Sequence, residues 1–185
     1  MTIERLTRDN FALTSLDAFV RTQPVTEVYR KIGGKYQLVR APFTDDWTSA
    51  RKREKAAELL SGACTAYGAW LDGRLAGFIQ LSNALNNGRL VVDSLHVSQN
   101  ARRHGIGRAL FAQALAEARA RGAGQLYFSA CSARETISFY LAMGCRLTDD
   151  PIPEAVEAEP FDLQLVCDVE GNSREPVVHP RESVV

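Results

Sequence analysis

The hydrophobic pattern of the chain changes its period near the middle, and this change constrains the fold more than any other feature. Leu90–Val97 is a short apolar run of the kind that forms a strand, and the polar segment 98–105, which ends in Arg-Arg-His-Gly, follows it. From Ile106 onward, apolar residues recur at helical spacing, as at Leu110 and Ala114. The chain therefore combines strands with amphipathic helices, and the segment 98–105 joins one of each.

Turn residues and helix-start signals predict the remaining elements. Gly33-Gly34 and Asp72-Gly73 each separate two β-prone runs, which is the pattern of a β-hairpin. In the first half of the chain we expect a strand at Thr2–Leu6, a helix at about Asn10–Val20, a hairpin over Val25–Val39, a polar segment from Pro42 to Asp45, a helix at Trp47–Leu60 and a hairpin over Cys64–Leu81. In the second half we expect the strand at Leu90–Val97, the helix from Ile106 to Gly122 and a strand at Gln125–Ala130, and then a helix that a capping box at Ser132 and Glu135 opens and Gly144 ends. The last two strands, at Cys145–Thr148 and Phe161–Val169, are joined by an acidic loop. No interior linker or repeat interrupts residues 1–169, so we expect a single domain there and a loose tail at 170–185.

Composition and charge exclude several classes of function. The 185 residues include 22 basic and 22 acidic side chains, and this neutral balance argues against a nucleic-acid partner. No apolar run approaches the roughly 18 residues of a membrane span, and the N-terminus has no apolar signal core. The four cysteines and three histidines are too scattered for a metal site, so we expect no metal and a reducing, cytoplasmic location.

Residues 102–108, which include three arginines and two glycines, have the features of a phosphate-binding site. The first backbone N–H groups of a helix have no intrahelical partner and lie at the positive end of the helix dipole. Gly105 and Gly107 leave room for a phosphate oxygen to approach the backbone, and Arg102, Arg103 and Arg108 add positive charge. The segment lacks the glycine spacing of both the P-loop and the dinucleotide fingerprint. An ordinary basic turn that caps a surface helix is the alternative interpretation.

Two segments together resemble the GNAT superfamily of N-acyltransferases. Residues 97–110, VSQNARRHGIGRAL, look like the family's acetyl-CoA signature, in which Gln or Arg is followed after two residues by Gly, one residue, and Gly or Ala. Residues 137–145, ISFYLAMGC, resemble the family's F-Y-x-x-x-G-F segment. The two motifs and the strands around them cover about Leu75–Val169, whereas the first 60 residues match less clearly.

The resemblance implies an α/β fold of the mixed α+β kind. Its twisted sheet is mostly antiparallel and flanked by helices, and the parallel strands 90–97 and 125–130 splay apart. Residues 1–74 form the variable, acceptor-side half of the domain, and residues 75–169 form the half that binds acetyl-CoA, the cosubstrate. The backbone of the first splayed strand would bind pantetheine, main-chain N–H groups from Arg103 to Arg108 would bind the pyrophosphate, and Ser132 would replace an asparagine that commonly contacts the coenzyme. The coenzyme-binding residues implied in this way are Leu95, Val97, Arg102, Arg103, His104, Gly105, Ile106, Gly107, Arg108 and Ser132.

Tyr140 and Asp93 are the candidate catalytic residues. The resemblance places Tyr140 beside the coenzyme sulfur, where its hydroxyl could protonate the leaving thiolate; a half-buried helix tyrosine is the alternative. Asp93 interrupts an apolar run, so burial could raise its pKa toward that of a useful base, and a water chain or a solvated surface position are its alternatives. Strand alternation places Asp93 on one face with Val91 and Leu95. It places His96 on the opposite face, where we expect a structural role.

The resemblance, with these residues, implies an N-acetyltransferase in which a primary amine of a small molecule, peptide or protein attacks acetyl-CoA directly in a ternary complex. A non-catalytic acyl-CoA-binding sensor is the alternative, and it would need neither Tyr140 nor Asp93. The resemblance favours a homodimer, and the Val25–Val39 hairpin could be a dimer contact, an acceptor wall or a plain structural hairpin. Four aspartates could line an acidic entrance for a polycationic amine or serve only in turns and caps, namely Asp45, Asp46, Asp149 and Asp150.

Overall fold

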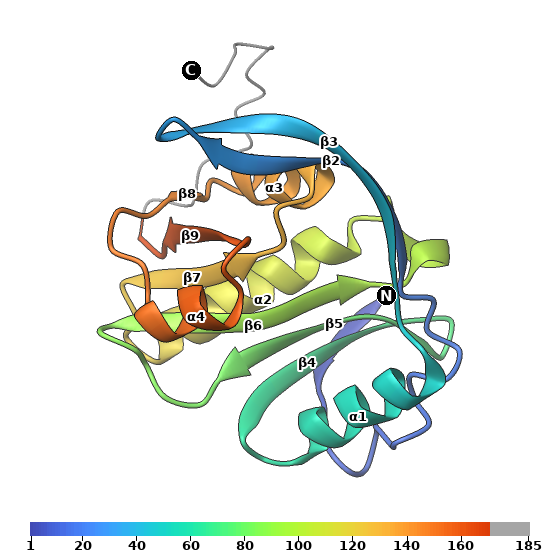
Figure 1. Ribbon diagram of the computed structural model, residues 1–185. Helices are drawn as coiled ribbons and strands as arrows, with labels where there is room; N and C mark the ends of the chain where they lie inside the picture. Colours follow the sequence, from blue (N-terminus) through green and yellow to red (C-terminus); the bar gives the residue numbers. More distant parts are fainter. Residues whose placement is uncertain (171–185) are drawn as a thin grey trace.

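The computed structural model describes residues 1–170, which form a seven-stranded sheet, a separate two-stranded hairpin and four α-helices (Figure 1). In spatial order the sheet contains β1 (Thr2–Arg5), β4 (Cys64–Leu71), β5 (Arg74–Ser82), β6 (Arg89–Val97), β7 (Gln125–Ala130), β9 (Leu163–Asp168) and β8 (Arg146–Leu147). The hairpin consists of β2 (Thr22–Ile32) and β3 (Lys35–Asp46). The helices are α1 (Ser49–Leu60), α2 (Ile106–Ala120), α3 (Arg134–Ala142) and α4 (Pro153–Ala158). β6 and β7 are parallel and the other pairs are antiparallel. The predicted mixed, mostly antiparallel sheet is confirmed. Apart from Glu170, the predicted tail lies outside the described residues.

Helix α2 covers one face of the sheet and supplies much of the main core (Figure 1). Ile106, Leu110 and Ala114 of this helix are buried against the central strands. The contact is so close that a Cβ atom on Gly77 of β5 would lie 2.8 Å from Ile106 Cγ2. The opposite face is covered by α1, by residues 7–20 and, over β7 and β9, by α4. This packing fixes the N-terminus of α2 beside the end of β6.

The parallel strands β6 and β7 separate part of the way along their length. Their pairing runs from Arg89 opposite Gln125 to Val92 opposite Phe128 and then stops. The remaining residues of β6 still pair with β5 on the other side, where Gly77 lies opposite Val97. One edge of the last half of β6 is therefore unpaired, as the resemblance predicts.

A β-bulge in β6 lies at the point where the splay begins. Leu81 of β5 is opposite Val92, but Gln80 is opposite Ser94, so Asp93 is an extra residue on β6. The bulge reverses the alternation of side chains: Leu95 packs with Val92 in the core beneath α2, while Val91 faces the opposite cluster. The prediction that Asp93 shares one face with both Val91 and Leu95 is wrong for this reason.

The β2–β3 hairpin is joined to both limbs of the splay. On the β6 side, the contact is made by Val20, two residues before β2: its N–H donates to Ser98 Oγ at 2.9 Å, and its carbonyl accepts from the Gln99 N–H at 2.8 Å, just after β6. On the β7 side, the Tyr29 N–H donates to the Ser132 carbonyl at 2.8 Å. The hairpin therefore bridges the open end of the sheet (Figure 1).

The predicted hairpin around Gly33-Gly34 is confirmed, but it is longer than expected. β3 continues to Asp46, and Phe43 lies opposite Val25. The expected polar segment at 42–45 is wrong, because pairing with β2 satisfies its backbone groups and keeps it extended.

The predicted helix at Asn10–Val20 is also wrong, and a series of turns replaces it. The N–H groups of Ser15, Asp17 and Phe19 each donate to the carbonyl three residues earlier, and the Ala12 N–H donates to Ser15 Oγ at 2.9 Å. Serine, threonine and aspartate side chains compete in this way with helical hydrogen bonds.

The start of α3 differs from the capping box that the sequence suggests. The N-cap is Ala133, and no side chain caps the helix. The Ser132 hydroxyl instead accepts a hydrogen bond from Arg30 Nη1 at 2.6 Å. A contact from β2 has therefore taken the hydroxyl that would have capped the helix. The loop expected before the last strand also contains the short helix α4, with Pro153 in its first turn.

Candidate active site

A cavity of about 600 Å³ lies where β6 and β7 diverge. Its walls come from the end of β6, the loop and first turn of α2, helix α3 and the start of β2. Most of the residues predicted for coenzyme binding and catalysis line it, namely Leu95, Val97, Arg102, Arg103, Gly105, Ile106, Gly107, Arg108 and Tyr140. The two sequence motifs thus meet at one cavity.

The first turn of α2 presents unpaired backbone N–H groups at this cavity. Gly105 is the N-cap, with a φ of +77° that glycine adopts without strain. The Ala109 N–H donates to the Gly105 carbonyl at 3.0 Å, so the N–H groups of residues 105–108 precede the first helical hydrogen bond. Together with the helix dipole and the neighbouring arginines, they form an anion-binding site.

Gly107 is a point of close approach between α2 and α3. A Cβ atom at this position would lie 3.3 Å from Phe139 Cε2 and 3.4 Å from Phe139 Cζ. The Phe139 ring also lines the cavity. The absence of a side chain at Gly107 therefore lets the tyrosine helix pack against the phosphate-binding turn.

Tyr140 is held by aromatic packing and also lines the cavity. Its ring centroid lies 4.6 Å from that of Phe128 and 5.3 Å from that of Phe139, and its exposed fraction is 8%. Among residues 1–170 its hydroxyl has no hydrogen-bond partner. Burial, followed by the charges of Cys145 and Asp162, raises the pKa of Tyr140 well above its ordinary value. The hydroxyl is therefore protonated at working pH and able to donate.

Asp93 lies on the bulge and is outside the lining of this cavity. Burial and then the charge of Glu58 raise its pKa to about 6, against the opposing effect of Lys55. The residue is nonetheless exposed to solvent at its surface position. Glu58 and Lys55 are paired with each other, their Oε2 and Nζ atoms being 2.5 Å apart. The bulge thus directs Asp93 toward α1 and leaves it a carboxylate that can exchange a proton near neutral pH.

His96 forms a buried polar contact with Arg21 at the cavity wall. Its Nδ1 accepts a hydrogen bond from Arg21 Nε at 3.1 Å, and its ring makes an edge contact with Trp47 at 4.8 Å between centroids. Burial and then the charge of Arg21 lower the pKa of His96 to about 3. A histidine held neutral in this way is a poor base, so Asp93 is the better candidate.

Two of the predicted coenzyme contacts lie outside the cavity lining. His104 Nδ1 is 2.9 Å from the Arg102 carbonyl oxygen, within its own turn. The Ser132 hydroxyl is occupied by Arg30. Their contacts with the coenzyme stay predictions.

Several lining residues were not predicted from the sequence. Thr136 and Met143 lie one helical turn from Phe139 and Tyr140, so helical spacing could have identified them. Gln23 and Pro24 come from the start of β2 and Arg21 immediately precedes it, and no local signal connects them to the motifs.

None of the four aspartates considered for an acidic entrance lines this cavity, and they lie in two separate places. Asp45 Oδ2 accepts from Arg21 Nη2 at 2.7 Å, and Asp46 accepts from the Trp47 N–H at 2.8 Å. Asp149 and Asp150 line a different pocket, which includes the first residue of β6 rather than its end.

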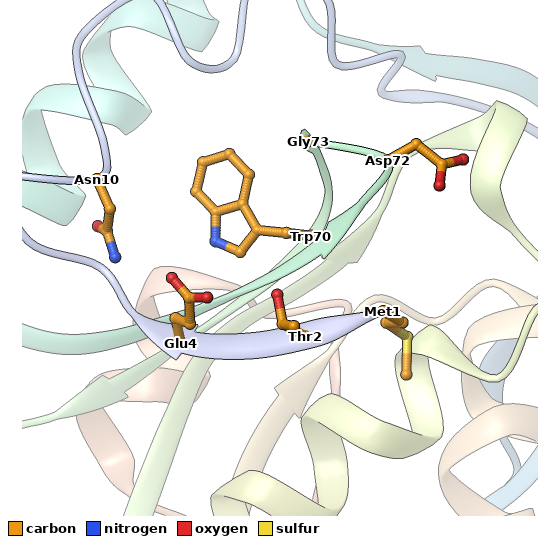
Figure 2. Close-up of a pocket in the computed structure, with 7 residues that line it drawn as sticks. All are labelled: Met1, Thr2, Glu4, Asn10, Trp70, Asp72 and Gly73. Carbon is orange, nitrogen blue, oxygen red and sulfur yellow. The ribbon is translucent and has the colours of Figure 1, made fainter.

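A second hollow lies at the edge of the sheet, along β1 and the β4–β5 turn (Figure 2). The Trp70 ring lies there beside Glu4 and Asn10, with Asp72 at the turn. None of the residues predicted for the site lines this hollow. Within residues 1–170 no group of three or more His, Cys, Asp or Glu side chains could hold a metal ion, and no helix is long and apolar enough to cross a membrane.

Comparisons of the sequence with known proteins agree on one family. The sequence model of the acetyltransferase (GNAT) family matches residues 35–145. The chain is 31% identical to the streptothricin acetyltransferase of Streptomyces lavendulae over 145 residues, which are 74% of this chain and 76% of the relative.

Solved structures share the fold. Nourseothricin acetyltransferase superposes with a TM-score of 0.70 at 22% identity, covering 91% of this chain and 98% of that one. A Bacillus anthracis protein described as a streptothricin acetyltransferase, in complex with acetyl coenzyme A, gives a TM-score of 0.67 at 16% identity, covering 91% and 99%.

Proposed function

Because the chain belongs to the acetyltransferase (GNAT) family and is an acetyl-CoA-dependent N-acetyltransferase, we propose that it acetylates a primary amine of a streptothricin-like small molecule. The amine attacks the thioester directly, in a ternary complex. The observation that carries the proposal is the cavity at the splay, which places the first turn of α2 and Tyr140 on one surface. The streptothricin acetyltransferase of S. lavendulae, at 31% identity, supports the choice of acceptor.

The cavity offers groups that suit the pyrophosphate, the pantetheine arm and the thioester of acetyl-CoA. The N–H groups of residues 105–108 suit the pyrophosphate, as they precede the first helical hydrogen bond. The edge of β6 at Leu95 and Val97, which β7 no longer pairs, suits the amides of the pantetheine arm, which would add to the sheet as a short strand. The Val97 carbonyl on this edge accepts from Arg102 Nε at 3.3 Å, so the arm would share it with Arg102. This order brings the thioester toward Tyr140.

Two carboxyl groups near the splay suit an amine acceptor. Asp93 is at the base of the β6 limb. Asp162 immediately precedes β9, whose Leu163 lies opposite Ala130 at the end of β7. Burial and then the charge of Glu159 raise the pKa of Asp162 to about 6, so both groups are largely ionised at pH 7. They would attract a cationic substrate to the open side of the sheet.

The proposed chemistry moves two protons. Asp93 accepts a proton from the attacking amine, directly or through a bound water, as the new C–N bond forms. The C–S bond breaks, and Tyr140 gives its hydroxyl proton to the departing sulfur. The sensor alternative is set aside because the chain belongs to a family of acetyltransferases.

Calorimetry followed by a thiol-release assay tests the function. Purified protein is expected to bind acetyl-CoA and not to bind NADH. Its affinity for dephospho-CoA should be lower than its affinity for acetyl-CoA. It should then release CoA thiol when streptothricin is added, and mass spectrometry should find one added acetyl group on the antibiotic. Peptides with free α-amines or lysines are the comparison acceptors. Failure to bind acetyl-CoA would overturn the coenzyme site, whereas turnover of peptides alone would overturn only the choice of acceptor.

The Gly107→Asp variant is expected to bind acetyl-CoA roughly 10- to 100-fold more weakly than the wild type. The added carboxylate opposes the pyrophosphate at the positive end of α2, where a negative charge from the ligand should lie. Gly107→Ala is the matched control, since it adds only the Cβ atom that meets Phe139 at 3.3 Å. Comparison of the calorimetric Kd values of the two variants separates the effect of the added negative charge from the effect of the added side-chain volume. Equal affinities for Gly107→Asp and wild type would rule out this placement of the pyrophosphate.

A further inference from the structure

We infer that Arg21 binds an amide carbonyl oxygen of the pantetheine arm of acetyl-CoA through its Nη1 group. This inference rests on the proposed function, which places the coenzyme in the cavity at the splay. It assigns a coenzyme contact to the acceptor-side half of the chain, outside both sequence motifs.

The guanidinium of Arg21 is buried and is fixed by two of its three nitrogens. The residue is 7% exposed. Its Nε donates to His96 Nδ1 at 3.1 Å, and its Nη2 donates to Asp45 Oδ2 at 2.7 Å. The carbon at the centre of the guanidinium lies 5.7 Å from the centroid of the Trp47 ring. These contacts hold the planar group in one orientation.

The third nitrogen, Nη1, is buried and has no partner within residues 1–170. Arginine carries only donors, so this group requires an acceptor, and a buried donor without one destabilises the structure. The rigid guanidinium cannot turn Nη1 toward another acceptor without breaking the contacts of Nε and Nη2. Arg21 also lines the cavity, so a bound molecule there is the natural source of the missing acceptor.

The position of Arg21 along β6 selects the part of the coenzyme. Its anchor, His96, lies between Leu95 and Val97, the residues whose unpaired edge suits the pantetheine arm. The pyrophosphate belongs at the N–H groups of residues 105–108, and the thioester belongs near Tyr140. Between these two ends, the arm offers amide carbonyl oxygens, and a charged N–H donor binds a carbonyl oxygen strongly.

The Arg21→Gln variant tests the contact, since glutamine is too short to reach the same point. Calorimetry should show about tenfold or greater weakening of acetyl-CoA binding, the usual effect of losing a hydrogen bond to a charged group. Adenosine 3′-phosphate 5′-diphosphate, which lacks the pantetheine arm, should bind both proteins equally. Arg21→Lys keeps the positive charge beside Asp45 and should also weaken acetyl-CoA binding, because it has a single nitrogen. It provides the test if the glutamine variant does not fold.

Asp45→Asn is the matched control, because the amide oxygen of asparagine can still accept from Nη2 and hold the guanidinium, while the negative charge is removed. Its affinity for acetyl-CoA should remain close to that of the wild type. Equal acetyl-CoA affinity in wild type and both Arg21 variants would overturn the inference. So would an equal loss for the nucleotide fragment, which would assign Arg21 to the phosphate loop, or a change confined to the KM of the amine. If the wild type itself fails to bind acetyl-CoA, the proposed function fails before Arg21 is tested.

Discussion

Replacement of Tyr140 by Phe is expected to lower kcat by about 10²- to 10⁴-fold, the range for loss of a positioned general acid. The ring that packs on Phe128 and Phe139 is retained, so the Kd for acetyl-CoA should be unchanged. The lost group is a hydroxyl without a partner in residues 1–170, which is protonated at working pH and free to donate to the departing sulfur. Single-turnover rates with saturating streptothricin measure the chemical step separately from product release.

Tyr127→Phe is the matched control for this prediction. Tyr127 is also a buried tyrosine, but its hydroxyl donates to Gln164 Oε1 and accepts from the Ile152 N–H, on the face covered by α4. This variant should lose thermal stability and keep its kcat. If Tyr140→Phe retains the wild-type single-turnover rate, Tyr140 is not the acid.

Replacement of Asp93 by Asn is expected to lower kcat by about 10²- to 10⁴-fold at pH 7.5, because the amide cannot accept the amine proton. The ratio of the wild-type kcat to the variant kcat should depend on pH. Asp93 has a pKa raised to about 6, so its carboxylate is present above pH 6 and is lost as the pH falls through that value. The ratio of wild-type to variant kcat should therefore be constant above about pH 7 and fall by about tenfold per pH unit below 6. Taking the ratio cancels the titration of the amine substrate.

A second variant tests whether the titrating group is Asp93. The charge of Glu58 contributes to the raised pKa of Asp93, while Lys55 opposes it. Glu58→Gln removes the negative charge that raises the pKa of Asp93 and leaves Lys55 without its partner, so the pKa of Asp93 should fall. The acidic limb of the kcat profile should therefore move to lower pH. An unmoved limb, or a ratio that does not change with pH, would assign the base role to another group or to solvent.

Much of the coenzyme site could be predicted because its signals are local. The glycines and the change to helical period define the start of α2, and the unpaired N–H groups follow from helix geometry alone. Gly33-Gly34 and Asp72-Gly73 likewise fix two hairpins through backbone conformations that few other residues adopt. The Phe-Tyr motif placed Tyr140 on the helix that lines the cavity.

The errors lie where a distant contact replaced a local preference. Ser132 has the spacing of a capping box, yet its hydroxyl is bound by Arg30, 102 residues earlier. The apolar period at 10–20 suggested a helix, but short polar side chains stabilise turns there while Phe19 is still buried. Local propensity is worth too little per residue to outweigh such tertiary contacts.

The sequence by itself determined the family, the parallel strand pair, the phosphate-binding turn and the tyrosine of the second motif. Each depends on residues close together in the chain, whose backbone geometry is set by neighbours. Only the tertiary structure decided that the bulge turns Asp93 toward α1 and that Arg21, 75 residues from His96, joins the wall of the cavity. A bulge depends on the register between two strands, and a contact across 75 residues depends on how whole elements pack. Neither is encoded in the period or spacing of any one segment.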